Sequence, residues 1–119
     1  MTTRNRNIEH FLPLTTQMLH TLLAVADGEK HGYAMMREIR TRTSGAVALS
    51  ASTLYGIVKR LLENGLLEES SERPDPALDD ERRRYYRLSD RGRSAAEGEA
   101  ARLEQTVRQA LAKLKLRKA

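Results

Sequence analysis

The sequence contains no cysteine and no tryptophan, and only one of its 119 residues is phenylalanine. The absence of cysteine excludes disulfide bonds, thiolate catalysis and zinc sites with cysteine ligands. The three histidines, His10, His20 and His31, share no spacing typical of metal ligands, and no pair of carboxylates stands beside them. We therefore expect neither a metal site nor another cofactor.

Long apolar segments are also missing. The longest, Leu22–Ala26, is far too short to cross a bilayer, which takes about 20 apolar residues. The first residues do not follow the pattern of a secretory signal, because Arg4 and Arg6 are not followed by an apolar segment. We expect no membrane association and a cytoplasmic location.

The sequence carries no motif of an enzyme. No nucleophile motif surrounds any serine, and no glycine-rich loop suited to phosphate groups occurs. What the chain has in excess is positive charge, with 21 Lys and Arg against 16 Asp and Glu, which gives a net charge of +5. A basic protein attracts polyanions, of which nucleic acid is the most common. A net charge of this size is also ordinary for a small domain. The positions of the charges must therefore show whether the protein binds nucleic acid.

Hydrophobic periodicity predicts four helices and a hairpin within one domain. The helices are expected over residues 15–26, 32–43, 50–64 and 90–116, with a weak strand over 46–49 and a β-hairpin over 67–72 and 83–88. The capping candidates are Thr15 or Thr16, Ser50 or Ser52, and Ser89 or Asp90. This order of elements is that of a winged helix-turn-helix with an appended helix.

We therefore expect a mainly α fold with a small β-hairpin, divided into an N-terminal arm (1–12), a winged helix-turn-helix DNA-binding domain (13–89) and a C-terminal dimerisation helix (90–119). In the last helix, apolar residues are spaced alternately by four and three, the heptad pattern of a helix–helix interface. They are Ala96, Ala100, Leu103, Val107, Ala110 and Leu114. The alternative is that this helix folds back on its own domain.

The third predicted helix has its apolar residues on one side and hydroxyl groups and cations on the other. Such side chains suit the phosphates and base edges of DNA. The candidates are Ser50, Ser52, Thr53, Tyr55, Lys59 and Arg60. We predict that Ser52 and Thr53 read bases, and that Tyr55 and Lys59 hold the helix on phosphates. Taken singly, Ser50 has a structural alternative as a helix cap and Lys59 as a solvated charge.

The predicted hairpin divides its charges between its two sides. Arginines crowd the return strand, among them Arg82, Arg83 and Arg84, whereas acidic residues crowd the first strand and the loop over 68–81. We expect Arg83 and Arg84 to contact DNA phosphates while the acidic loop stays off the duplex. The alternative is that the two sets pair as solvated salt bridges, which contribute little energy. A second function also stays open, a protein–protein interaction module that docks through the acidic loop.

Several short strings occur in a characteristic order and spacing. They are His31-Gly32-Tyr33, Ser52-Thr53-Leu54-Tyr55 with Lys59-Arg60-Leu61, Glu63-Asn64-Gly65-Leu66, and Arg84-Tyr85-Tyr86-Arg87-Leu88-Ser89 with Gly92. Together they resemble the PadR family of transcription regulators, in the short form that ends in a single long dimerisation helix. The resemblance covers nearly the whole chain, from about Leu12 onward.

The resemblance implies a sequence-specific regulator, usually a repressor, that binds double-stranded DNA at an inverted repeat as a homodimer. It also implies that Tyr33 touches a backbone phosphate. Many such proteins release DNA when a small-molecule effector binds, which leaves an effector open for this chain. Two features depart from the family pattern. Gly56 stands where relatives often have a larger side chain, and the lack of tryptophan excludes stacking a flat ligand between tryptophans.

Overall fold

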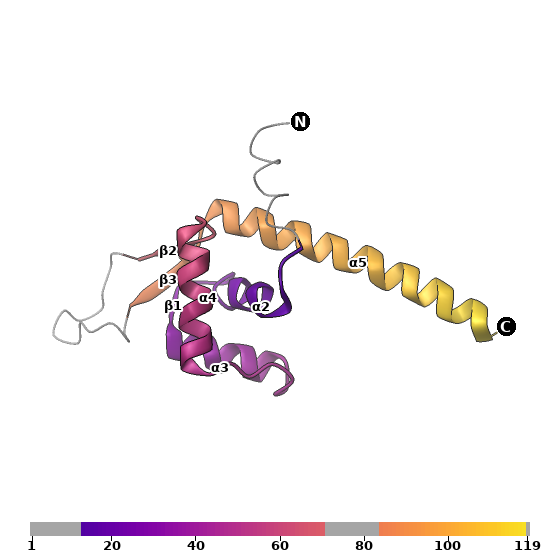
Figure 1. Cartoon of the computed structure of the whole chain (residues 1–119), viewed down its shortest axis with the longest axis horizontal. Helices are drawn as coiled ribbons and strands as arrows, with labels where there is room; N and C mark the ends of the chain where they lie inside the picture. The colour runs from indigo at the N-terminus through magenta and orange to yellow at the C-terminus, as the bar shows by residue number, and fades with distance from the viewer. Residues whose placement is uncertain (1–12, 71–83, 119) are drawn as a thin grey trace.

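The computed structural model describes residues 13–70 and 84–118, and it arranges them as a group of helices with a small sheet at one side (Figure 1). In chain order the elements are α2 (Thr16–Ala24), β1 (Lys30–His31), α3 (Gly32–Arg42), α4 (Ala51–Glu63), β2 (Leu67–Glu69), β3 (Tyr85–Leu88) and α5 (Asp90–Lys118). This is the mainly helical fold with a long last helix that the sequence predicts. The expected N-terminal arm and the acidic loop beyond Ser70 lie outside the described residues.

Side-chain caps explain where the helices begin. Three of the expected capping positions are confirmed, with bonds from Met18 N to Thr15 Oγ1 (3.1 Å), from Thr53 N to Ser50 Oγ (3.2 Å) and from Gly92 N to Ser89 Oγ (2.9 Å). At the start of α3 the cap is one that the sequence did not suggest. There the ring of His31 accepts a bond of 3.2 Å at Nδ1 from the backbone N–H of Ala34.

The sheet is antiparallel, and its strand order is β1-β3-β2. The predicted hairpin is confirmed in β2 and β3, where Glu68 lies opposite Arg87 and Leu67 opposite Leu88. A third strand joins it from far along the sequence, since His31 of β1 lies opposite Tyr85. The central strand β3 is therefore paired on both sides.

The weak strand expected over 46–49 is wrong. The backbone of Ser44 and Gly45 is left-handed, with φ of +52° and +84°, so the chain turns sharply after α3. Thr43 fixes this turn because its hydroxyl donates to Ile39 O (2.8 Å) and accepts from Val47 N (3.0 Å). The edge of β3 where a further strand could pair is already occupied by β1. Leu49 instead packs into the core, where it is buried.

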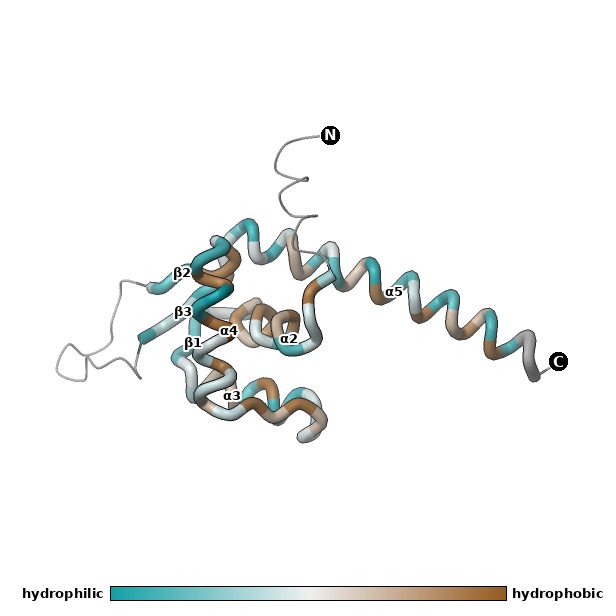
Figure 2. The backbone as a smooth tube through the Cα atoms, viewed as in Figure 1, coloured by the Kyte–Doolittle hydropathy of each residue, from teal (hydrophilic) through white to brown (hydrophobic). Residues whose placement is uncertain are grey.

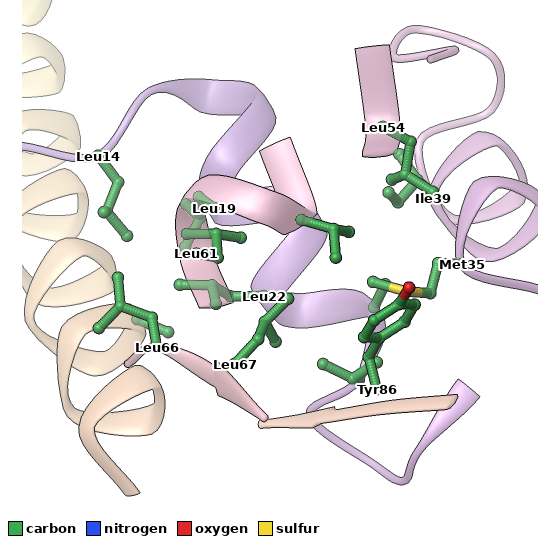
Figure 3. Close-up of a cluster of buried hydrophobic side chains, with 14 of the residues drawn as sticks. Leu14, Leu19, Leu22, Met35, Ile39, Leu54, Leu61, Leu66, Leu67 and Tyr86 are labelled. Carbon is green, nitrogen blue, oxygen red and sulfur yellow. The ribbon is translucent and has the colours of Figure 1, made fainter. Parts of the chain in front are cut away.

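The core lies where the helices and the sheet meet (Figure 3). Large side chains from α2, α3, α4 and the strands are fully enclosed there, among them Leu22, Met35, Ile39, Leu54, Leu61, Leu66 and Leu67. Tyr86 reaches the same cluster from β3 and lies beside Met35 (Figure 3). These contacts fix α4 against α2 and α3, and so determine which side of α4 stays exposed.

The last helix has two different halves. Its first turns close the core, where Ala95 and Ala96 are buried, whereas residues 100–115 are all exposed. Hydrophobic and hydrophilic residues alternate along this second half (Figure 2). The helix therefore projects far beyond the rest of the chain (Figure 1), and the molecule with this helix included extends 64 Å along its longest axis. The domain boundary predicted at residue 89 falls at the start of a helix that continues the core. Across the described ranges, no helix combines the length and apolarity needed to cross a membrane.

A buried carboxylate marks the place where α5 leaves the core. The side chain of Glu99 is only 2% exposed and accepts a bond of 3.2 Å from the backbone N–H of Leu14, ahead of α2. Arg102, one turn on, donates to both carboxylate oxygens at 2.5 and 3.1 Å. These bonds lower the pKa of Glu99, chiefly through Arg102, although its burial acts in the opposite direction.

Candidate nucleic-acid interface

Helix α4 separates its buried and exposed residues cleanly. Leu54, Val58 and Leu61 are enclosed in the core. The opposite side is exposed and is formed by Ser52, Gly56, Lys59, Arg60 and Glu63. We call these five residues the exposed face of α4. Because Lys59 and Arg60 follow Gly56 by three and four positions, they flank it on the helix surface.

The N-terminal turn of α4 is organised by Ser50. Its hydroxyl accepts from the backbone N–H of Thr53 and lies 3.0 Å from Thr53 Oγ1 and 3.4 Å from Ser52 Oγ. Ser50 is therefore a helix cap, the structural role that the sequence also suggested for it. The two predicted base readers are both exposed beside it. Ser50 positions their hydroxyl groups as part of the same hydrogen-bonded cluster.

Tyr55 does not belong to the exposed face of α4. Its side chain is half-buried, and its hydroxyl oxygen is fully enclosed. The ring lies so close to Gly32 that a Cβ atom there would overlap the phenol oxygen. In this arrangement Tyr55 packs α4 against the start of α3, and its hydroxyl is not presented to a duplex. We therefore correct its expected role from phosphate contact to packing.

Helix α3 carries two exposed arginines, Arg37 and Arg40, for which the sequence predicted no role. Tyr33, which is 53% exposed, shares one flank of α3 with Arg37 and Arg40 by helical spacing. The opposite flank faces α2, because Arg42 bonds there to His20. Within the described ranges, Arg37 and Arg40 make no ion pair. The signal that could have found them is their shared spacing with Tyr33.

The contact between Arg42 and His20 fixes α3 against α2. Arg42 Nη1 lies 2.8 Å from His20 Nδ1, and the same guanidinium pairs with Glu38 at 2.8 and 2.9 Å. Burial and the nearby positive charge of Arg42 lower the pKa of His20, which Glu38 partly opposes. The neutral imidazole accepts the hydrogen bond at Nδ1, so the protonated form would disrupt the contact.

The arginines of the hairpin are paired where the structure describes them. Arg84 lies 3.4 Å from Glu69, and Arg87 lies 3.0 Å from Glu68, across β2 and β3. This matches the alternative in which the two charge sets pair with each other. Such exposed pairs are weak, so Arg84 can exchange its carboxylate for another anion at little cost. Arg82 and Arg83 lie outside the described residues.

The apolar residues of the predicted dimerisation seam fall into two groups. Ala96 is buried in the core of its own chain, which corrects its expected role at a dimer interface. Ala100 and Ala110 are exposed. Leu103, Val107, Leu111 and Leu114 are between 38% and 56% exposed, and we call these four residues the apolar stripe. Leu111 was missed, although it follows Val107 by one helical turn and could have been found from that spacing.

The fold is similar to solved structures of transcription regulators. A regulator from Clostridium thermocellum is 21% identical, with a TM-score of 0.66, over 95% of this chain and 96% of that chain. A PadR family regulator from Clostridium difficile is 19% identical, with a TM-score of 0.61, over 80% and 97% of the two chains. PadR of Bacillus subtilis, solved with operator DNA, is 17% identical, with a TM-score of 0.60 over 72% of this chain. The match spans 47% of that longer protein.

No curated protein matches this sequence. The family model described as "Transcriptional regulator PadR-like family" matches residues 21–98, which run from α2 through the core-forming start of α5. This match confirms the expected family and a regulator rather than an enzyme. The chain belongs to the PadR-like family of transcriptional regulators.

Proposed function

We propose that this protein is a sequence-specific DNA-binding transcription regulator, a repressor that binds an inverted-repeat operator as a homodimer. The observation that carries the proposal is the exposed face of α4. It presents the Ser52 hydroxyl group and the cations of Lys59 and Arg60, with the Glu63 carboxylate at the C-terminal end, on a helix whose other side is held by the core. Among the described residues, Lys59 and Arg60 make no ion pair, so both are available to phosphates.

Within this proposal, the roles divide by position. Ser52 and Thr53 at the N-terminal turn of α4 contact base edges, as recognition-helix residues do in helix-turn-helix proteins. Lys59 and Arg60 contact the phosphates that line the groove. Tyr33, Arg37 and Arg40 extend the phosphate contacts along α3. Arg84 of the wing joins these contacts by exchanging its weak pair with Glu69 for a phosphate.

The comparison with Bacillus subtilis PadR supports DNA as the partner, since that protein was solved in complex with operator DNA. DNA as the ligand also implies action in the compartment that holds the genome. The competing module for protein–protein interaction rests on the acidic loop over 68–81, which lies outside the described residues from position 71 onward. The described ranges add no observation in its favour.

A small-molecule effector has little support from the described surface. A hollow of about 500 Å³ is lined only by α5, from Ala101 to Ala112. A second, of about 340 Å³, is lined only by α3, from Ala34 to Arg42. A hollow lined by one helix cannot enclose a ligand on several sides, as small-molecule sites do.

The DNA-binding proposal is tested by gel shift on the protein's own promoter region, across a series of salt concentrations. Specific binding should weaken steeply with salt, and Lys59→Ala should reduce the slope of log K against log salt by about one unit. Lys113→Ala is the matched control, because Lys113 is exposed on the second half of α5 and is not part of the exposed face of α4. It should leave the slope unchanged. Equal binding to promoter and random duplex would contradict the proposal.

The dimer proposal rests on the apolar stripe, which a lone chain would leave in water. We expect sedimentation to give a dimer at micromolar concentration. Val107→Glu should shift the equilibrium to monomer, because it places a charge in the interface centre. Gln105→Glu adds the same charge on the opposite side of α5 and should leave the dimer intact. A wild-type monomer at this concentration would refute the dimer.

A further inference from the structure

Gly56 occupies the centre of the exposed face of α4. It lies in the middle of a helix of 13 residues, four positions after Ser52. Lys59 and Arg60, with long side chains, flank it on the next turn. The face is therefore low at Gly56 itself and higher where Lys59 and Arg60 lie, with Glu63 two turns further along the same line of the helix. At Gly56 the helix backbone is therefore uncovered between two long cationic side chains.

Nothing within the described residues requires glycine at this position. A Cβ atom added to Gly56 would meet no atom within 4 Å, and its backbone is not left-handed. Gly32 and Gly92 differ, since a Cβ atom would overlap the Tyr55 hydroxyl at the first and the Leu66 carbonyl at the second. Glycine is also a poor helix former, so Gly56 makes α4 less stable than alanine would. Gly56 therefore lowers the stability of α4, and no contact within the described residues accounts for it.

Resting on the proposed function, we propose that Gly56 determines specificity, as the point where α4 approaches the floor of the DNA major groove most closely. The groove is only slightly wider than a helix with its side chains, so the depth of insertion depends on the side chains at the leading edge. At Gly56 that edge is bare backbone. The absent Cβ lets Ser52 and Thr53 reach base edges with short side chains while Lys59 and Arg60 stay on the phosphates.

The proposal separates two kinds of DNA binding. Contacts to phosphates tolerate a small outward shift of the helix, because long cationic side chains can follow the backbone. Hydrogen bonds from short hydroxyl side chains to bases do not tolerate it, because they act over a narrow range of distance. A side chain at position 56 should therefore weaken operator binding while sparing binding to random DNA.

The test is Gly56→Ala, measured for thermal stability and for affinity to an operator fragment and to a random duplex of equal length. We expect the melting temperature to rise, because alanine favours a helix more than glycine does. Affinity for the operator should fall about tenfold, the effect of one lost base contact. Affinity for the random duplex should stay within about twofold, because phosphates supply it.

Gly98→Ala is the control, since it makes the same change in α5, on the side of that helix away from the apolar stripe. It should leave the ratio of the two affinities unchanged. The proposal is overturned if Gly56→Ala binds the operator as wild type does. It is also overturned if both affinities fall equally, or if Gly98→Ala lowers the ratio as much. A wild type without preference for the operator would instead refute the proposed function, and this inference with it.

Discussion

The hydroxyl of Ser89 donates a hydrogen bond of 2.6 Å to the carbonyl oxygen of Gly65. Ser89 is the cap of α5, and Gly65 stands in the turn after α4 with a φ of +76°. One side chain thus joins the end of the proposed reading helix to the start of the proposed dimerisation helix. If α5 sets the distance between two copies, this contact helps to set the distance between their reading helices.

Ser89→Ala should lower the free energy of unfolding by about 1–2 kcal/mol, since it removes a helix cap and leaves the Gly65 carbonyl without its hydroxyl donor. Ser89→Thr keeps a hydroxyl group and should recover most of the loss. Chemical denaturation at one protein concentration measures both. An alanine variant as stable as wild type would show that the bond adds nothing.

Gly92→Ala should destabilise the protein, although alanine favours a helix more than glycine does. Alanine ordinarily stabilises a helix, but a Cβ atom at this position would overlap the carbonyl oxygen of Leu66, which is backbone and cannot rotate away. We expect a loss of about 1–3 kcal/mol, typical of overpacking. Thermal melts of Gly92→Ala and Gly56→Ala should therefore move in opposite directions. A rise in both would contradict the close approach of α5 to Leu66.

Glu99 should make stability depend on acid pH. Its pKa is lowered in the folded chain, chiefly by Arg102, so its charged form contributes stability that is present above the usual range of glutamate. This contribution is lost as the pH falls through the lowered pKa. The unfolding free energy of wild type minus that of Glu99→Gln should therefore shrink on acidification. A difference that stays constant from neutral to acid pH would contradict the assignment.

His20 should have a separate effect nearer neutral pH. Its pKa is lowered by burial and by Arg42, so the neutral ring is the stable form, and stability is fully present above the ordinary histidine pKa. It declines as the pH falls from there through the lowered value. The effect is small because the ring is partly exposed. His20→Asn keeps an acceptor and cannot protonate in this range, so the stability of the variant should change less with pH than that of wild type. Greater acid sensitivity of the variant would count against this reading.

The caps and the apolar periods could be predicted because they are local. Thr15, Ser50 and Ser89 indicate helix starts because their hydroxyl groups accept hydrogen bonds from backbone N–H groups of the first turn. The strand β1 could not be found in this way, since Lys30 and His31 are too short a run to show a period. The strand β1 forms because the folded chain brings it to the edge of β3 that β2 does not occupy, and this placement depends on tertiary structure.

The same limit explains the errors in the candidate site. The helical period places Tyr55 at the border of the exposed face, but only the position of α3 shows that the ring is covered by Gly32. Ala96 and Leu103 share one heptad pattern, and nothing in that pattern shows where α5 leaves the core. The pairing of Arg84 with Glu69 likewise depends on the register of β2 and β3.

The two halves of α5 are in phase, since Ala96 in the core and Val107 and Leu114 in the apolar stripe fall on one line along the helix. A helix is stiff in torsion, and each residue turns it by about 100°. A single residue inserted between Arg102 and Leu103 would rotate the stripe to another side while leaving the core and the Glu99–Arg102 pair in place. The number of residues between Glu99 and Leu103 therefore fixes the direction in which α5 presents its apolar side relative to α4.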